Sequence, residues 1–325
     1  MSSKNSNCMV WEPPLIQPHR IGEINKFGRA RPREKQVSRV FDIDIEQLKA
    51  QYGSPLFVTS ESRLRQNVRQ LKRAFEVRYG NVSHGWSYKT NYISAVCNIM
   101  HQEGSLAEVV SAFEYEKARQ LGVPGEKIIF NGPNKTRKIL ERAIADGAQI
   151  NIDHLDELQL IESVAQGQGR CATVGLRLNF DTGFSEPWSR FGFNIESGQA
   201  HQAAKQVVMS EHLRLKGLHS HIGTFILEPR AYCEQVKIMC KFMRDLEGRE
   251  EVCIDTIDIG GGLPSHNALQ GIYLPPDQVV PSIGEYAEAI CNTLVEETMY
   301  RTRTNRPMPD RKSTRLNSSH ITLSR

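Results

Sequence analysis

Strand-like and helix-like segments alternate along most of this chain, and that alternation restricts the fold more than any other feature. Helical patterns such as residues 61–77 carry apolar residues at helical spacing. Between the helical patterns lie eight short segments with the character of buried strands: 56–60, 83–89, 106–111, 127–132, 149–154, 173–179, 215–223 and 256–262. Eight strand–helix units predict an α/β fold, a parallel (β/α)8 TIM barrel over residues 55–309. A doubly wound sheet is the alternative, but the first strand lacks the G-x-G-x-x-G turn typical of it.

The C-terminal residues have a different character. Residues 310–320 read DRKSTRLNSSH, which matches the conceptual translation of a widely used sequencing-library adapter. We therefore expect residues 310–325 to be a non-native tail. The whole chain has 41 Lys and Arg against 37 Asp and Glu, a net charge of +4. Without the tail the counts are 37 and 36, which leaves +1.

This charge and the composition exclude several classes of protein. A net charge near zero gives no case for a nucleic-acid partner. No apolar run approaches the length of a bilayer span, and the N-terminus lacks the layout of a secretory signal, so we expect no membrane partner and a cytoplasmic location. The seven cysteines are widely spaced and form no C-x-x-C pair, which predicts neither a zinc site nor a disulfide framework.

Polar residues close several predicted strands, at the end of the barrel where catalytic groups gather. Gly260, Gly261 and Gly262 end the eighth predicted strand, where their N–H groups can approach a phosphate, although a tight turn also needs such glycines. Thr224 could add a hydroxyl to the same phosphate. His219 and His221 are two residues apart on a strand and therefore point to one face. They could bind a metal as a pair, supply an imidazole for stacking or proton transfer, or simply be packed residues.

Lys89 is the lysine in this polar ring. A lysine at a strand end is either a solvated rim residue or, where desolvation and nearby cations act on it, a nucleophile. Combined with a phosphate cradle on the facing strands, Lys89 favours covalent chemistry with pyridoxal phosphate.

Six segments, in order along the chain, carry a resemblance to a known family. They are SYKTN at 87–91, EVVSAFE at 108–114, FNGPNKT at 130–136, RFG at 190–192, HSHIGT at 219–224 and DIGGG at 258–262. Together they resemble the barrel domain of the fold-type III pyridoxal-phosphate decarboxylases, a group that includes diaminopimelate, ornithine and arginine decarboxylases. The chain is most similar to the diaminopimelate type.

The resemblance implies a fold, a cofactor and a set of roles. It implies an alanine racemase-like barrel that binds pyridoxal 5′-phosphate and decarboxylates a basic or diamino acid, as in lysine biosynthesis. Lys89 would carry the cofactor covalently and transfer protons. His221 would support the cofactor ring, and Arg177 would help orient Glu108 near the link to the lysine. Thr224 and residues 260–262 would anchor the phosphate.

The resemblance also implies a larger parent protein. Residues 1–54 are expected to form an arm with a strand, near residues 21–27, that joins a C-terminal β-domain missing here. The family's Glu-Pro-Gly-Arg motif, whose glutamate pairs with the pyridine nitrogen, is expected after residues 305–309 and is absent. We therefore expect a homodimer for the full-length parent and poor turnover by this chain.

Other functions stay open at this point. The substrate is expected to be a small amino acid, but another decarboxylase of the ornithine, arginine or carboxynorspermidine type is an alternative. So are a racemase of the alanine racemase type and a non-catalytic pyridoxal-phosphate-binding protein.

Overall fold

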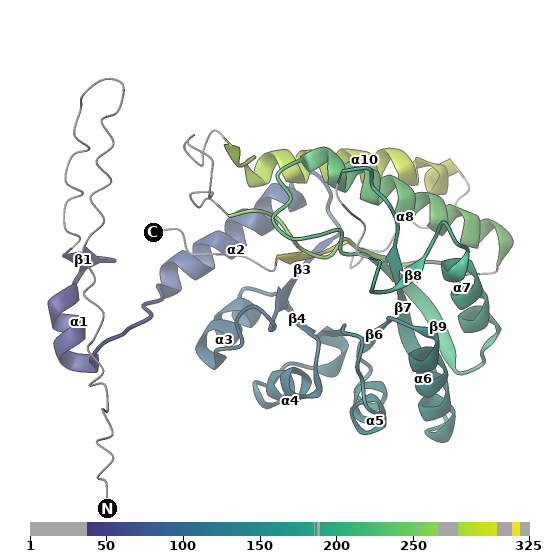
Figure 1. Ribbon diagram of the computed structural model, residues 1–325, viewed down its shortest axis with the longest axis horizontal. Helices are drawn as coiled ribbons and strands as arrows, with labels where there is room; N and C mark the ends of the chain where they lie inside the picture. Colours follow the sequence, from purple (N-terminus) through teal and green to yellow (C-terminus); the bar gives the residue numbers. More distant parts are fainter. Residues whose placement is uncertain are drawn as a thin grey trace, which may run out of the picture. The chain divides into compact units, whose positions relative to one another are not determined.

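The computed structural model describes residues 38–184, 186, 189–250, 252–265, 279–303 and 314–318. The chain divides into two units, Met1–Val58 and Thr59–Arg325 (Figure 1). In the first unit, β1 (Arg39–Val40) pairs antiparallel with β2 (Ile43–Asp44), and α1 (Ile45–Tyr52) follows. The strand expected near residues 21–27 lies outside the described residues.

The second unit is a closed barrel of parallel strands with helices around it (Figure 1). Its strands are β3 (Val82–Ser87), β4 (Leu106–Val109), β5 (Ile128–Phe130), β6 (Gln149–Ile152), β7 (Ala172–Asn179), β9 (Leu213–His219), β10 (Thr256–Asp258) and β11 (Thr314–Ser318). They pair in the order β6-β5-β4-β3-β11-β10-β9-β7, and a pairing of β6 with β7 closes the ring. A short strand, β8 (Phe193–Asn194), adds to β7. The predicted (β/α)8 barrel is confirmed.

One of the predicted strands is wrong. Residues 56–60 have no regular structure, and Phe57 is fully exposed. Both edges of β3 are already paired, one with β4 and the other with β11, so the ring offers no place for a further strand there. The eighth strand is instead β11, from the segment predicted to be a non-native tail. The origin of that tail stays a prediction.

The helices bury one face each against the barrel. They are α2 (Glu61–Glu76), α3 (Ser94–Gln102), α4 (Ala112–Gln120), α5 (Arg137–Ala145), α6 (Leu155–Gly167), α7 (Gln199–Met209), α8 (Pro229–Arg249) and α10 (Ile283–Arg303), with a 3-10 turn at Gly125–Lys127. In α2, which Ser60 caps, the predicted apolar stripe of Leu64, Val68, Leu71 and Phe75 is buried. Helices α8 and α10 lie side by side on the outside of the barrel (Figure 1).

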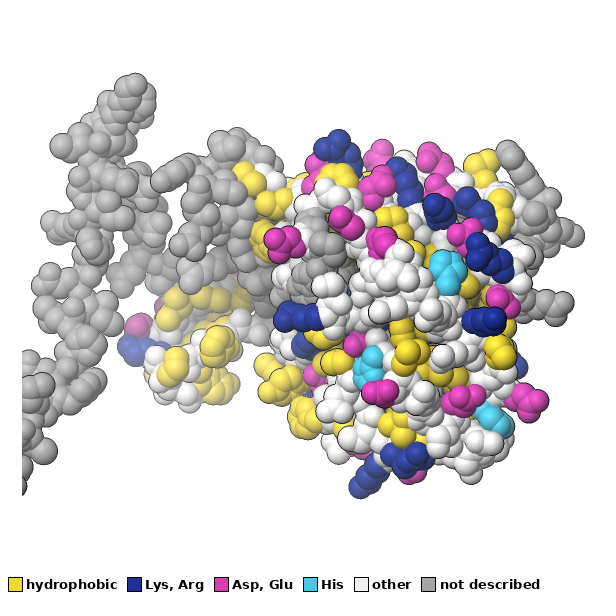
Figure 2. All heavy atoms as spheres, turned by 45° about the vertical axis from the view of Figure 1, so that its right-hand side comes forward, with side chains coloured by type: hydrophobic (Ala, Val, Ile, Leu, Met, Phe, Trp, Pro, Cys, Tyr) yellow, Lys and Arg dark blue, Asp and Glu magenta, His cyan; other side chains and the backbone are white. Residues whose placement is uncertain are grey.

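The face of the molecule drawn in Figure 2 carries mixed charge. Figure 2 shows acidic and basic side chains interspersed over the face that it presents. Among the described residues, no helix combines the length and the apolar character that a bilayer crossing requires.

His84, on β3, makes the stability of the barrel dependent on pH. It is 1% exposed, and its Nδ1 lies 2.8 Å from Ser105 Oγ. Burial, with a smaller contribution from Lys72, lowers the pKa of His84 from the ordinary value of 6.5 to about 3. Between these values the unfolded chain takes up a proton that the folded chain excludes. Stability should therefore be complete above pH 6.5 and fall as the pH drops toward 3, by up to about 1.4 kcal/mol per pH unit for this one group.

Urea unfolding between pH 7 and pH 4 measures this dependence. The slope of unfolding free energy against pH should be smaller in His84→Gln than in the unaltered chain. An identical slope in both proteins would contradict the assignment to His84.

Candidate active site at the mouth of the barrel

A cavity of about 210 Å³ opens at the carboxyl ends of the barrel strands. The residues that line it end or follow β3, β4, β5, β7, β9 and β10. They are Ser87, Lys89, Glu108, Val110, Asn131, Gly132, Pro133, Arg177, Phe191, His219, His221, Gly260 and Gly261. In barrels of this type the carboxyl end is the face that carries the chemistry.

Most of the predicted site residues meet in this cavity. Those that line it are Lys89, Glu108, Arg177, His221, Gly260 and Gly261. Thr224 is exposed and Gly262 is buried beside Gly223, and neither belongs to the lining. Their proposed contacts with a phosphate stay predictions.

Lys89 is presented to the cavity by a tight turn after β3. Thr90 donates to Ser87 O through both its backbone N, at 3.2 Å, and its Oγ1, at 2.8 Å. Tyr88 is fully buried, and its Oη lies 2.7 Å from His101 Nε2 on α3. Tyr88 and Lys89 are the two central residues of this turn: the Tyr88 side chain is buried against α3, and Lys89 lines the cavity. The Lys89 side chain is exposed, and the desolvation expected for it is not seen.

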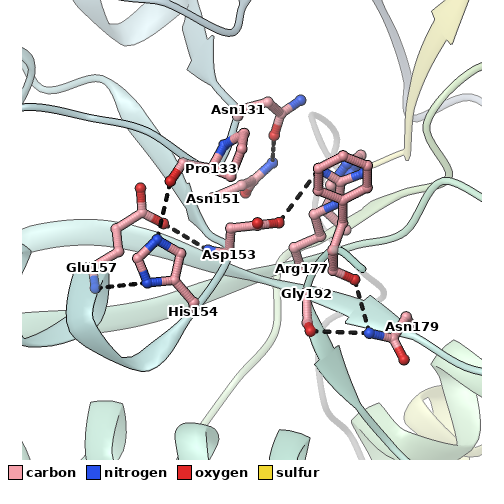
Figure 3. Close-up of polar contacts among 12 residues, drawn as sticks. Asn131, Pro133, Asn151, Asp153, His154, Glu157, Arg177, Asn179 and Gly192 are labelled. Carbon is pink, nitrogen blue, oxygen red and sulfur yellow. Dashed lines mark hydrogen bonds and ion pairs between the residues drawn. The ribbon is translucent and has the colours of Figure 1, made fainter. Parts of the chain in front are cut away.

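Glu108, on β4, is positioned by a row of buried amide side chains. Asn131 Nδ2 donates to Glu108 Oε1 at 2.8 Å, and Asn151 Nδ2 donates to Asn131 Oδ1 at 2.7 Å. Figure 3 shows the second of these bonds. The row continues to Gln149, whose Nε2 lies 3.4 Å from Asn151 Oδ1. One carboxylate oxygen of Glu108 is therefore held by Asn131, which follows β5, and Asn131 is held in turn by Asn151 on β6.

Arg177, on β7, lies between an aromatic ring and a carboxylate. Its guanidinium is 4.6 Å from the centre of the Phe191 ring, and its Nη1 is 3.4 Å from Asp153 Oδ1 (Figure 3). Burial lowers the pKa of Arg177, and the charge of Asp153 opposes that shift. Asp153 N donates to Glu157 Oε2 at 2.7 Å, and Glu157 Oε1 accepts from the buried Lys135 Nζ, also at 2.7 Å. The direct ion-pair partner of Arg177 is thus Asp153.

His221 presents a neutral ring to the cavity. Gly261 N donates to His221 Nδ1 at 3.1 Å, so the ring proton of the neutral imidazole is on Nε2. Burial and then the neighbouring His219 lower the pKa of His221 to about 3. The ring is therefore uncharged at neutral pH and offers Nε2–H as a donor.

The glycine loop, residues 260–262, needs its glycines for backbone reasons. Gly260 has φ +71° and Gly262 has φ +98°, values that side chains disfavour. A Cβ at Gly260 would lie 2.7 Å from Ser220 O, and one at Gly262 would lie 2.1 Å from Gly223 O. The glycines allow this loop to approach the segment that follows β9.

Two N–H groups of the glycine loop already have partners in the protein. Gly260 N donates to Asp258 Oδ1 at 2.9 Å, and Gly261 N donates to His221. The expected phosphate cradle therefore depends on groups other than these two donors, or on their release when the phosphate binds.

Asp258 does not line the cavity, but it contacts two residues that do, Gly260 and His219, and no role at the site was predicted for it. Asp258 is fully buried, and its Oδ2 lies 3.2 Å from His219 Nδ1. The sequence signal for Asp258 is an acidic residue two positions before a glycine turn, a place where its oxygen can accept a backbone N–H. Asn131 closes the fourth predicted strand and was therefore expected in the ring of polar residues at the strand ends, but no role was predicted for it. Among the described residues, no cluster of three or more potential metal ligands occurs.

The residues of this cavity fit pyridoxal phosphate. An accessible lysine amine, a neutral imidazole and a fixed carboxylate converge on it, and a turn that needs glycine at positions 260 and 262 lies at its edge. A closed parallel barrel with this set at its carboxyl end defines the class of proteins that hold a cofactor through a barrel lysine.

Comparison with known proteins agrees with this class. The family model described as "Pyridoxal-dependent decarboxylase, pyridoxal binding domain" matches residues 61–301, and the chain belongs to this family. It is 30% identical over 268 residues to the diaminopimelate decarboxylase of Methanocaldococcus jannaschii, a match that covers 78% of this chain and 59% of the relative. With the enzyme of the same name from Zymomonas mobilis it shares 31% identity over 264 residues, covering 77% and 60%.

The solved structures agree with the sequence relatives. The crystal structure of the M. jannaschii diaminopimelate decarboxylase has a TM-score of 0.74 at 28% identity and covers 85% of this chain and 63% of its own. A second structure of that enzyme, in complex with L-lysine, has a TM-score of 0.73 at 27% identity. The chain spans about 60% of the length of the curated relatives it matches.

Proposed function

We propose that this chain is the cofactor-binding barrel of a pyridoxal-phosphate-dependent decarboxylase that acts on a diamino acid of the diaminopimelate type. The observation that carries the proposal is the convergence of Lys89, Glu108 and His221 on one cavity. The names of the relatives support the substrate class, and that class would place the reaction in lysine biosynthesis.

Each residue has a role that follows from its geometry. When bound, pyridoxal phosphate supplies the electron sink that lets the α-carboxylate leave as carbon dioxide. Lys89 Nζ would hold the cofactor covalently and, once the substrate amine displaces it, accept or donate a proton at the mouth of the cavity. The neutral His221 ring would support the cofactor ring. Glu108, with Oε1 fixed by Asn131, would keep its other oxygen available as a proton acceptor.

The wider organisation forms part of the same proposal. We infer a homodimer for the full-length parent, a small amino acid as its substrate, no nucleic-acid or membrane partner, and a cytoplasmic location. Residues 1–54 would form the arm and residues 55–309 the cofactor-binding barrel apart from β11, which lies in residues 310–325, the segment proposed as the non-native tail.

Chemical trapping tests the attachment of the cofactor. After incubation with pyridoxal phosphate and reduction with borohydride, peptide mapping by mass spectrometry should find the label on Lys89. The label should fall to background in Lys89→Ala and persist in Lys117→Ala, a control that removes a lysine of α4 outside the cavity lining. Labelling of Lys89→Ala at the level of the unaltered chain would refute the assignment.

Product analysis separates the proposed function from its alternatives. Assays of the full-length parent with diaminopimelate, lysine, ornithine and arginine should release carbon dioxide, and most rapidly from diaminopimelate. Inversion of the amino acid without carbon dioxide would favour the racemase, and binding of cofactor without turnover would favour the non-catalytic protein.

A further inference from the structure

Two buried polar side chains of α8 face the ends of β9 and β10. Gln235 is fully buried, and its Nε2 donates to Ser220 O at 3.0 Å and to Ile259 O at 2.9 Å. Tyr232, three residues earlier on the same face of the helix, donates from its Oη to Gly261 O at 3.1 Å. These three carbonyls belong to the two segments that carry His221 and the glycine loop.

The place of these contacts explains why they are needed. The ladder between β9 and β10 continues as far as the bond from Ser220 N to Asp258 O, at 2.9 Å. Beyond it the regular ladder ends, so the buried carbonyls of Ser220 and Ile259 need donors from elsewhere, and leaving them without donors would be costly. A primary amide nitrogen carries two hydrogens, so Gln235 can serve both carbonyls at once and fix their separation.

On the cavity side, the same two segments are joined by a different bond. Gly261 N donates to His221 Nδ1, while the carbonyl of Gly261 is held from the helix side by Tyr232. Both peptide groups of Gly261 are therefore restrained, one toward the cavity and one toward α8. If the helix-side contacts were lost, the loop could move away from β9 and release the imidazole.

We propose that Gln235 and Tyr232 are positioning residues that hold the glycine loop against β9, so that Gly261 N–H fixes the tautomer and orientation of His221. The significance of this for the cofactor ring rests on the proposed function. The positioning itself is a property of the chain without cofactor, and it can be measured there.

The test uses variants that keep the volume of the side chain and remove its donor. Gln235→Met removes both hydrogen bonds of the amide, and Tyr232→Phe removes the hydroxyl. Tyr115→Phe is the matched control, because Tyr115 is equally buried and its hydroxyl donates to Asp146 on the opposite side of the barrel. The measurements on cofactor-free protein are amide hydrogen exchange at Gly261 and the ¹⁵N chemical shift of His221 Nδ1.

The expected results are specific to the loop. Exchange at Gly261 should accelerate about 10-fold or more in Gln235→Met and less in Tyr232→Phe, while exchange in β7 stays unchanged. The Nδ1 shift of His221 should move from that of a hydrogen-bond acceptor toward a mixture of tautomers, and Tyr115→Phe should show neither change. In the presence of pyridoxal phosphate, its Kd should rise about 10-fold in Gln235→Met.

The outcomes separate the two proposals. Unchanged Gly261 exchange and an unchanged His221 signal in Gln235→Met would overturn the positioning role, whatever the cofactor does. If the unaltered chain fails to bind pyridoxal phosphate but the exchange and tautomer changes occur, the positioning role stands and the proposed function fails.

Discussion

Lys135→Met is expected to lower the free energy of unfolding by about 3–5 kcal/mol. Lys135 is 4% exposed, and its Nζ donates to Gly132 O at 2.6 Å, Asn151 O at 2.9 Å and Glu157 Oε1 at 2.7 Å. Burial lowers the pKa of Lys135, and the charge of Glu157 opposes that shift. Methionine has a similar length but no donor, so the substitution leaves a buried carboxylate and two buried carbonyls without their shared cation.

Chemical denaturation measures this loss, and Lys138→Met provides its control. Lys138 lies on the same segment but is exposed, so the same substitution should change the unfolding free energy by no more than about 0.5 kcal/mol. Equal effects of the two substitutions would show that the buried pair does not stabilise the barrel.

Gly262→Ala is expected to abolish cofactor binding and to destabilise the chain by at least about 1–3 kcal/mol, the cost of the disfavoured backbone conformation alone. The added Cβ would also lie 2.1 Å from Gly223 O, a contact that only movement of one of the two loops can relieve. Either movement changes the edge of the cavity at which His221 and the glycine loop meet.

The matched control for this substitution is Gly248→Ala in α8. A Cβ there would meet nothing within 4 Å, and alanine favours the helix by about 0.5–1 kcal/mol, so the same chemical change should be neutral or stabilising. Equilibrium dialysis with pyridoxal phosphate and urea unfolding should be carried out on both variants. Retention of cofactor affinity by Gly262→Ala would contradict the role given to this turn.

Most of the barrel could be predicted from the sequence because parallel strands buried on both faces leave a strong local pattern. The pattern does not predict a strand correctly where pairing with neighbouring strands decides whether a segment joins the sheet. Residues 56–60 are as apolar as a strand, but both edges of β3 are taken, and apolar character cannot reveal this. The strand β11 was not expected because its sequence, TRLNS, has a single large apolar residue and forms a strand only between two existing neighbours.

The residues of the site likewise fall into those that the sequence predicts and those that it does not. Lys89, Glu108, Arg177 and His221 could be found because each closes or follows a predicted strand, and the carboxyl ends of parallel strands must share one face. The residues that hold them could not. Gln235 lies within an ordinary amphipathic helix, and its role depends on carbonyls 15 and 24 residues away in the sequence. The partnership of Lys135 with Glu157 likewise spans 22 residues, from the segment after β5 to α6.

The strand β11 comes from the segment that we propose is non-native, and its place in the ring sets the distance between the two ends of the cofactor site in this structure. Lys89 follows β3 and the glycine loop follows β10, but these strands do not pair with each other; β11 lies between them and pairs with both. Adjacent strands are about 4.8 Å apart. With β11 between them, β3, which presents the lysine amine, and β10, which presents the glycine loop, are therefore about 10 Å apart. Since backbone hydrogen bonds alone set this distance between β3 and β10, it is independent of which side chains β11 carries.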